Sequence, residues 1–227
     1  MENNLQFEMR NSIILALLLA STGCAHVQKE QPVTQTAPVN TDKNIVANDV
    51  PVNTNKSIVE NMDSDYSPTF AKAHPNAQRL MKDEFFFSVI EETAPFGSDD
   101  GADAYAGFKD WRPMHRSESP VRFLQYQFER WEYPLFDFHE TSFEKLKPYL
   151  EESFTGMRLM RGIDAAIVAT AFGQLYLEGT IGSDIKELAK LSVKRELLSE
   201  VLKTWEEHAD VRQMKLEKLL NVLNEVK

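Results

Sequence analysis

The sequence contains one cysteine, Cys24, among its 227 residues. A single cysteine excludes an intramolecular disulfide and any metal site built from several thiolates. The five histidines include no pair at a metal-ligand spacing such as HxxxH. The sequence also lacks a Walker loop and a GxSxG nucleophile elbow. We therefore expect no metal and no cofactor, and no motif identifies a catalytic residue.

Positive charge is in deficit. The chain has 25 Lys and Arg residues against 35 Asp and Glu residues, which gives a formal net charge of −10. A nucleic-acid-binding domain would need a basic patch or stripe. The composition therefore argues against a nucleic-acid partner.

The N-terminus contains a short apolar run, IILALLLA, at residues 13–20. Spanning a bilayer takes about 20 residues, so this run is too short to cross one. It has the length of a signal-peptide hydrophobic region, and Arg10 precedes it. Small residues follow it as far as Cys24, which resembles a bacterial lipobox. We interpret residues 1–23 as a signal peptide that is cleaved before Cys24.

Residues 1–8 fit this signal less well, because Glu2 and Glu8 are acidic where a basic segment is expected. Translation from Met9 would remove both. Acyl chains on Cys24, palmitate among them, would anchor the protein to a membrane surface. Ala25, rather than aspartate, follows the cysteine. By resemblance to enteric lipoproteins, this favours the outer membrane, with the domain in the periplasm.

Residues 24–73 are rich in Pro, Thr, Asn, Gln and Val, a composition typical of a disordered linker. A 13-residue segment, PVNTDKNIVANDV at 38–50, is followed directly by a similar one, PVNTNKSIVENMD at 51–63. Repeats of folded solenoids are longer, at about 20–50 residues. The tandem repeat therefore indicates a spacer. A motif that a partner recognises is the alternative.

Residues 74–227 are predicted to form one all-α domain of six to seven helices with a long C-terminal helix. No useful length of the chain alternates apolar and polar residues as a half-buried strand would. Residues 163–177 are apolar nearly all round, which indicates a central buried helix rather than a membrane span. The apolar residues repeat at helical spacing in the segments 76–92, 99–111, 120–131, one from Thr141, 163–177 and 197–226.

The densest polar cluster is GSDDGAD, residues 97–103, with Asp99, Asp100 and Asp103. Read as an EF-hand from Asp99, the segment fails at two ligand positions, although an irregular calcium site remains an alternative. The carboxylates could instead act as acid and base in a hydrolase. The favoured interpretation is a helix start, with Asp99 or Asp100 as the N-cap and Phe96 packing against Tyr105 or another residue of the new helix.

Four segments of the chain resemble the YfeS-like family of bacterial proteins. They are AHPNAQRLMKDEFFF (73–87), EETAPFGSDDGADAYAGFKDWR (91–112), SPVRFLQYQFERWEYPLFD (119–137) and DAAIVATAFGQLYLEG (164–179). The resemblance implies that residues 73–227 form one domain. It implies no activity and no catalytic residues. By this resemblance, the lipoprotein signal and the linker look like additions to the family's domain.

Three functional hypotheses follow. The first is a membrane-anchored periplasmic protein-interaction module, which fits an acidic helical domain on a long tether. The second is a hydrolase that uses the acidic cluster at 99–103. The third is a structural envelope protein that oligomerises through the apolar stripe of 197–226. The sequence favours a binding protein over an enzyme.

Overall fold

The structure, a computed structural model, describes residues 67–227. The predicted signal peptide, Cys24 and most of the predicted linker lie outside the described residues. Within 67–227 there are helices and no strand, which confirms the all-α class. The α-helices are α3 (Pro75–Leu80), α4 (Asp99–Trp111), α5 (Pro120–Trp131), α6 (Phe143–Glu152), α7 (Gly156–Glu178), α8 (Ser183–Glu196), α9 (Ser199–Leu202) and α10 (Ala209–Glu225). The 3-10 helices are η1 (Phe70–Lys72), η2 (Glu84–Phe87), η3 (Arg112–Met114) and η4 (Lys203–His208).

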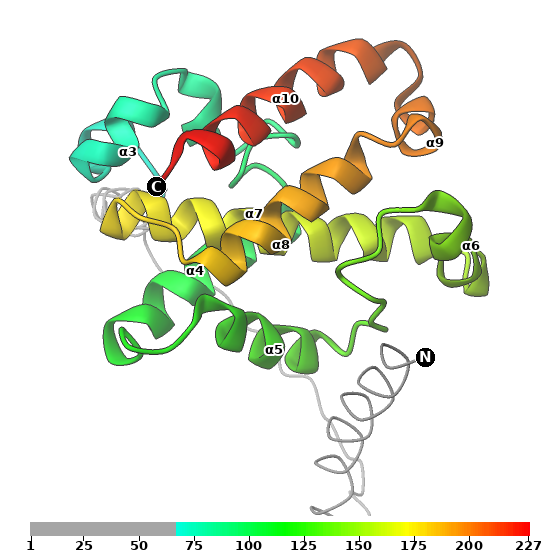
Figure 1. Cartoon of the computed structure of the whole chain (residues 1–227), viewed down its shortest axis with the longest axis horizontal. Coiled ribbons are helices and arrows are strands. Elements are labelled where there is room, and N and C mark those ends of the chain that lie inside the picture. Colours follow the sequence, from blue (N-terminus) through cyan, green and yellow to red (C-terminus); the bar gives the residue numbers. More distant parts are fainter. Residues whose placement is uncertain (1–66) are drawn as a thin grey trace, which may run out of the picture. The chain divides into compact units, whose positions relative to one another are not determined.

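Helix α7 is the centre of the domain (Figure 1). It makes its largest contacts with α4 and α8, and α5, α6 and α3 also pack on it. Of its 23 residues 16 are buried, so the prediction of a central buried helix is confirmed. Gly179 ends α7 with a φ of 74°, a left-handed conformation that glycine adopts without strain. None of the helices formed by residues 67–227 is both long and apolar enough to cross a membrane.

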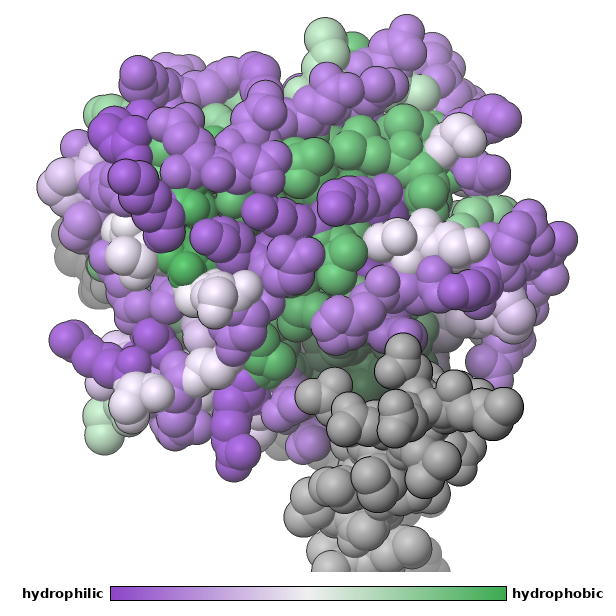
Figure 2. Space-filling model, viewed as in Figure 1, coloured by the Kyte–Doolittle hydropathy of each residue, from purple (hydrophilic) through white to green (hydrophobic). Residues whose placement is uncertain are grey.

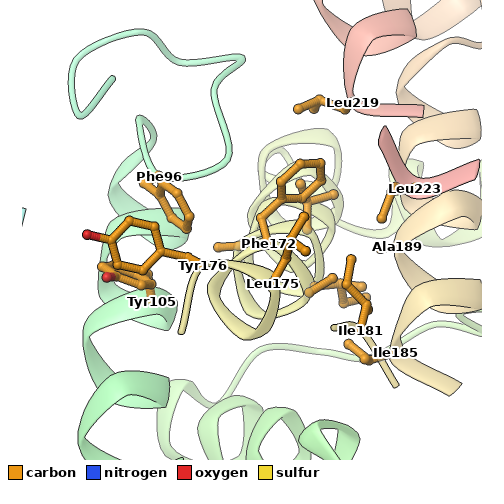
Figure 3. Close-up of a cluster of buried hydrophobic side chains, with 14 of the residues drawn as sticks. Phe96, Tyr105, Phe172, Leu175, Tyr176, Ile181, Ile185, Ala189, Leu219 and Leu223 are labelled. Carbon is orange, nitrogen blue, oxygen red and sulfur yellow. The ribbon is translucent and has the colours of Figure 1, made fainter. Parts of the chain in front are cut away.

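The core lies on both sides of α7 (Figure 3). On one side, the ring centroids of Phe96 and Tyr105 are 4.5 Å apart, which confirms the predicted contact across the start of α4. Tyr176 of α7 completes this aromatic cluster, 5.9 Å from Tyr105. On the other side, α7 faces α8 and α10, whose Ile185 and Leu223 are fully buried.

The prediction of one helix over residues 76–92 is wrong, because α3 ends at Leu80. The carboxylate of Asp83 accepts a hydrogen bond from the backbone N–H of Phe85 and caps the short helix η2 instead. Consecutive residues of an α-helix point about 100° apart, so a helix with one buried face would not direct both Phe85 and Phe86 fully into the core. With the helix broken, Phe86 stacks on Phe172 and Phe87 contacts Tyr176.

The C-terminal helix is bent rather than straight. The kink is at Glu206, inside η4 and between α9 and the long helix α10, where φ is 50° and ψ is −124°. Leu216, Leu219 and Leu223 of α10 are buried against the rest of the domain, whereas Val211 and Met214 near its start are exposed. Figure 2 shows hydrophobic residues gathered between α8 and α10 on an otherwise largely hydrophilic face. The predicted stripe is therefore mainly the inner side of this helix pair.

Candidate functional site

Helix α4 begins at Asp99, and Ser98 is its N-cap. The backbone of Ser98 is extended, and its Oγ accepts a hydrogen bond from the N–H of Gly101 at 3.1 Å. The prediction that Asp99 or Asp100 caps this helix is therefore wrong, because both residues already have helical geometry. They occupy the first turn, where a negative charge suits the helix dipole. The preceding turn needs glycine, since a Cβ at Gly97 would lie 1.9 Å from the carbonyl oxygen of Glu91.

The three aspartates of the predicted acidic site do not all lie together in the structure. Asp99 and Asp100 line one cleft, whereas Asp103, one turn further along α4, is exposed and does not line it. Among residues 67–227, no group of three or more His, Cys, Asp or Glu side chains is arranged to hold a metal ion. The structure thus brings together two of the three predicted residues.

Asp100 is held in a hydrogen-bonded triad with Arg158 of α7 and Tyr133. Its carboxylate lies 3.1 Å from Arg158 Nη2 and accepts a hydrogen bond from the Tyr133 hydroxyl at 2.8 Å. Burial and the bond to Asp100 raise the pKa of Tyr133, so this hydroxyl remains a donor. Gly162 makes room for the triad, because a Cβ there would lie 2.8 Å from Asp100 Oδ2.

The triad borders an open cleft of about 430 Å³, which we call the arginine cleft. Three arginines from two helices line it, together with three carboxylates, an exposed isoleucine and a floor of small residues. The lining residues are Ile90, Glu92, Gly97, Ser98, Asp99, Asp100, Arg158, Arg161, Gly162, Ala165 and Arg212. Ile90 is 90% exposed, so the rim offers an apolar contact beside the charges.

Arg161 of α7 and Arg212 of α10 are joined by a polar network at one end of the cleft. Arg212 donates to Glu196 at 2.6 Å and to Thr93 at 3.1 Å. The guanidinium carbons of Arg161 and Arg212 lie 4.9 and 3.8 Å from the ring centroid of Trp205. Both cation–π contacts fix the orientation of the two guanidinium planes.

This network concentrates unsatisfied polar atoms. In the part of the chain that the structure describes, five buried side-chain atoms have no hydrogen-bond partner, and four of them lie here. They are Arg161 Nε, Glu196 Oε1, Trp205 Nε1 and Arg212 Nε. A native protein leaves few such groups, and each one indicates strain, a bound solvent molecule or a functional contact. The cluster therefore marks this end of the arginine cleft as its most unusual part.

Beneath the cleft, a buried ion pair connects α7 to α8. Arg195 and Asp164 are 0% and 1% exposed, with Nη2 and Oδ1 2.6 Å apart. Arg195 Nη1 also donates to the carbonyl oxygens of Phe138 and Glu140. Burial raises the pKa of Asp164 to about 7, although the charge and hydrogen bonds of Arg195 act in the opposite direction. The pair supports the helices that carry the cleft.

None of the three arginines of the cleft is among the site residues predicted from the sequence. Arg158 and Arg161 are three residues apart on one face of α7, just before its apolar segment, and this spacing is visible in the sequence. Arg212 is distant in sequence and is brought to the cleft only by the packing of α10. No local pattern marks it.

A second cleft, of about 580 Å³, lies along η3 and α5. Trp111 and His115 stack there with ring centroids 4.3 Å apart, and His115 Nδ1 lies 2.8 Å from the carbonyl oxygen of Trp111. Arg122 pairs with Glu118 on its exposed rim. This cleft has no buried unsatisfied group among its lining residues, so the arginine cleft is the better candidate site.

Comparisons with protein-family models, with curated proteins and with solved structures each return no match. The resemblance to the YfeS-like family therefore stays a prediction.

Proposed function

We propose that the chain is a lipid-anchored periplasmic lipoprotein whose helical domain binds a protein partner at the arginine cleft. Lipid on Cys24 would hold it at the outer membrane, and the linker would let the domain reach a partner nearby. The support for the anchor comes from the sequence, where the only cysteine occupies the lipobox position.

One observation carries the binding role: the arginine cleft combines charges of both signs with the exposed side chain of Ile90. Protein interfaces are rich in arginine and in apolar anchor residues surrounded by polar groups. An open cleft of this kind suits a segment of another protein.

The hydrolase hypothesis finds less support in this cleft. Asp100 is the most buried of its carboxylates, yet it is already bonded to Arg158 and Tyr133. Glu92 and Asp99 are exposed, and general acid catalysis needs an environment that keeps a carboxyl group protonated near neutral pH. The oligomer hypothesis relied on an exposed apolar stripe, but Leu216 and Leu219 are buried within the domain.

The test is capture of a partner by the full-length protein in detergent from envelope extracts. The wild type is compared with the cleft variant Ile90→Asp and with Leu135→Asp, a matched change at a residue that is also exposed but lies outside the arginine cleft. We expect a specific partner with the wild type and Leu135→Asp, and its loss with Ile90→Asp. Equal recovery by all three proteins would refute a role for the cleft.

A further inference from the structure

The three arginines of the arginine cleft are not equally close to carboxylates. Arg158 is matched by Asp100, at 3.1 Å. Arg161 and Arg212, in contrast, share one carboxylate: Glu196 Oε2 lies 2.6 Å from Arg212 Nη2 but 4.0 Å from Arg161 Nε. Of the three cleft arginines, Arg161 therefore has the most distant ion-pair contact among residues 67–227.

Arg161 has no close carboxylate of its own within the described residues, because the Glu196 carboxylate lies nearer to Arg212. Within the described chain, the hydrogen bonds of Arg161 go to neutral oxygens, Val201 O and Thr204 Oγ1. Its side chain is 24% exposed, and its Nε has no hydrogen-bond partner among residues 67–227. Burial lowers the pKa of Arg161 and the charge of Arg212 adds to this effect, whereas the charges of Glu196 and Glu92 oppose it. A partly desolvated cation of this kind gains most from an added negative group.

The geometry around Arg161 is fixed before any ligand arrives. Its guanidinium lies over Trp205, and two further contacts hold Nη2. The nine-tenths-buried side chain of Arg212 lines the same cleft, and its Nε is also unsatisfied. A planar guanidinium that is already oriented matches a carboxylate with little loss of entropy.

The rim restricts which anion fits. Glu92 and Asp99 are exposed on the same cleft, so a small anion with several charges would be repelled on entry. A peptide segment that has a basic group near its carboxylate would satisfy both ends of the cleft. Charge complementarity thus favours binding of a peptide segment that carries charges of both signs rather than binding of phosphate.

We propose that Arg161 binds a carboxylate of a partner's peptide segment, while Glu92 and Asp99 attract a basic group of that segment. The carboxylate is an acidic side chain or a chain end. This assignment rests on the proposed function, because it names the part of the partner that enters the arginine cleft.

Calorimetric titration of the full-length protein in detergent tests the assignment with three probes. They are the peptide Lys-Ala-Ala-Glu with a free chain end, the peptide Lys-Ala-Ala-Gln-amide and inorganic phosphate. We expect the first peptide to bind roughly 10- to 100-fold more tightly than the amide. A hydrogen bond from Arg161 to a charged carboxylate is stronger than one to a neutral amide, and the difference in binding free energy corresponds to about that ratio of affinities. Equal affinity of the two peptides, or tighter binding of phosphate, would overturn the assignment.

Two variants locate the carboxylate. Arg161→Gln should reduce the affinity for Lys-Ala-Ala-Glu by about tenfold or more, and Arg122→Gln, in the second cleft, should leave it unchanged. Circular dichroism checks that both variants fold. If Arg161→Gln is unfolded, the comparison of probes on the wild type decides alone. Equal binding by a folded Arg161→Gln variant contradicts the assignment.

Failure of this inference differs from failure of the proposed function. If a partner is captured through Ile90 but peptides show no preference for a free carboxylate, the binding role is supported and the carboxylate assignment is contradicted. If the peptide with a free carboxylate binds selectively but no partner is captured, the carboxylate site is supported and the protein-binding role is contradicted.

Discussion

Arg195 satisfies almost every donor of its guanidinium inside the domain. Its Nε and Nη2 bond to Asp164, Nη2 also donates to Ser192, and Nη1 bonds to two carbonyl oxygens of the segment before α6. A pair this deeply buried stabilises a structure only while both partners are present.

Replacement of Arg195 with methionine should lower the free energy of unfolding by about 3–5 kcal/mol, because it leaves Asp164 buried without its partner. Urea denaturation followed by circular dichroism measures the change. Arg122→Met removes an exposed arginine and should shift stability by about 0.5 kcal/mol or less. Similar losses in both variants would contradict a structural role for the ion pair.

Arg112 and Glu178 form the second strong pair, with bidentate contacts of 2.6 and 3.0 Å. Burial raises the pKa of Glu178, but hydrogen bonds from Arg112 and Gln174 outweigh it, so the pKa lies below its usual value. A lowered carboxylate pKa stabilises the fold above the unfolded-state pKa of about 4.3. That contribution is lost as the pH falls through the folded-state pKa.

Glu178→Gln should therefore be less stable than the wild type at pH 7, by about 1–2 kcal/mol. The difference should shrink as the pH falls from about 5 to 3, because the wild type then loses the charged pair as well. Urea midpoints measured across this range test the prediction. A difference that stays constant with pH would show that the glutamate charge is not responsible.

At the level of elements, the sequence predicts best where one pattern is uninterrupted. Residues 99–111 and 120–131 form α4 and α5 within the expected limits, because Ser98 and Ser119 cap them and Pro120 starts the second. The prediction of one helix over 76–92 is wrong because the side chain of Asp83 accepts a hydrogen bond from the backbone N–H of Phe85. The spacing of apolar residues does not reveal this competition.

Helix α8 was overlooked although its signal is present. Its buried residues follow a helical spacing from Ile185 through Leu188 and Ala189 to Ser192 and Val193. The serine and the many charged residues between them obscured the stripe. The candidate site was predictable only in part for a related reason: Asp99 and Asp100 stand out locally, whereas Arg212 reaches the arginine cleft through tertiary packing alone.

The kink before α10 carries backbone strain. Glu206 has φ 50° and ψ −124°, a conformation that suits glycine and costs other residues about 1–3 kcal/mol. Glu206→Gly should therefore raise the free energy of unfolding by about 1 kcal/mol, after the added flexibility of the unfolded chain is subtracted. The neighbouring change Glu207→Gly, at a helical position, should lower it by about 0.5–1 kcal/mol. Chemical denaturation of both variants gives the sign directly, and a loss of stability in Glu206→Gly would show that the kink is unstrained.

For the whole molecule, the main prediction concerns the anchor. Cys24→Ser should move the protein from the membrane fraction to the soluble fraction, because a serine cannot receive the lipid. Ser21→Leu, which brings the segment closer to a common lipobox, should keep it in the membrane fraction. Fractionation followed by immunoblotting measures both, and a membrane-bound Cys24→Ser protein would contradict the lipoprotein assignment.

The central position of α7 has a consequence for the order in which the chain folds. Synthesis delivers a chain from its N-terminus. Helices α4 and α5 therefore emerge before α7, the helix on which both pack, and α8 and α10 arrive last. The domain can complete its core only after residue 178 has appeared, so its first half stays open during synthesis. If residues 1–23 are a signal peptide, as we propose, this delay would keep the chain open enough to pass through a narrow export channel.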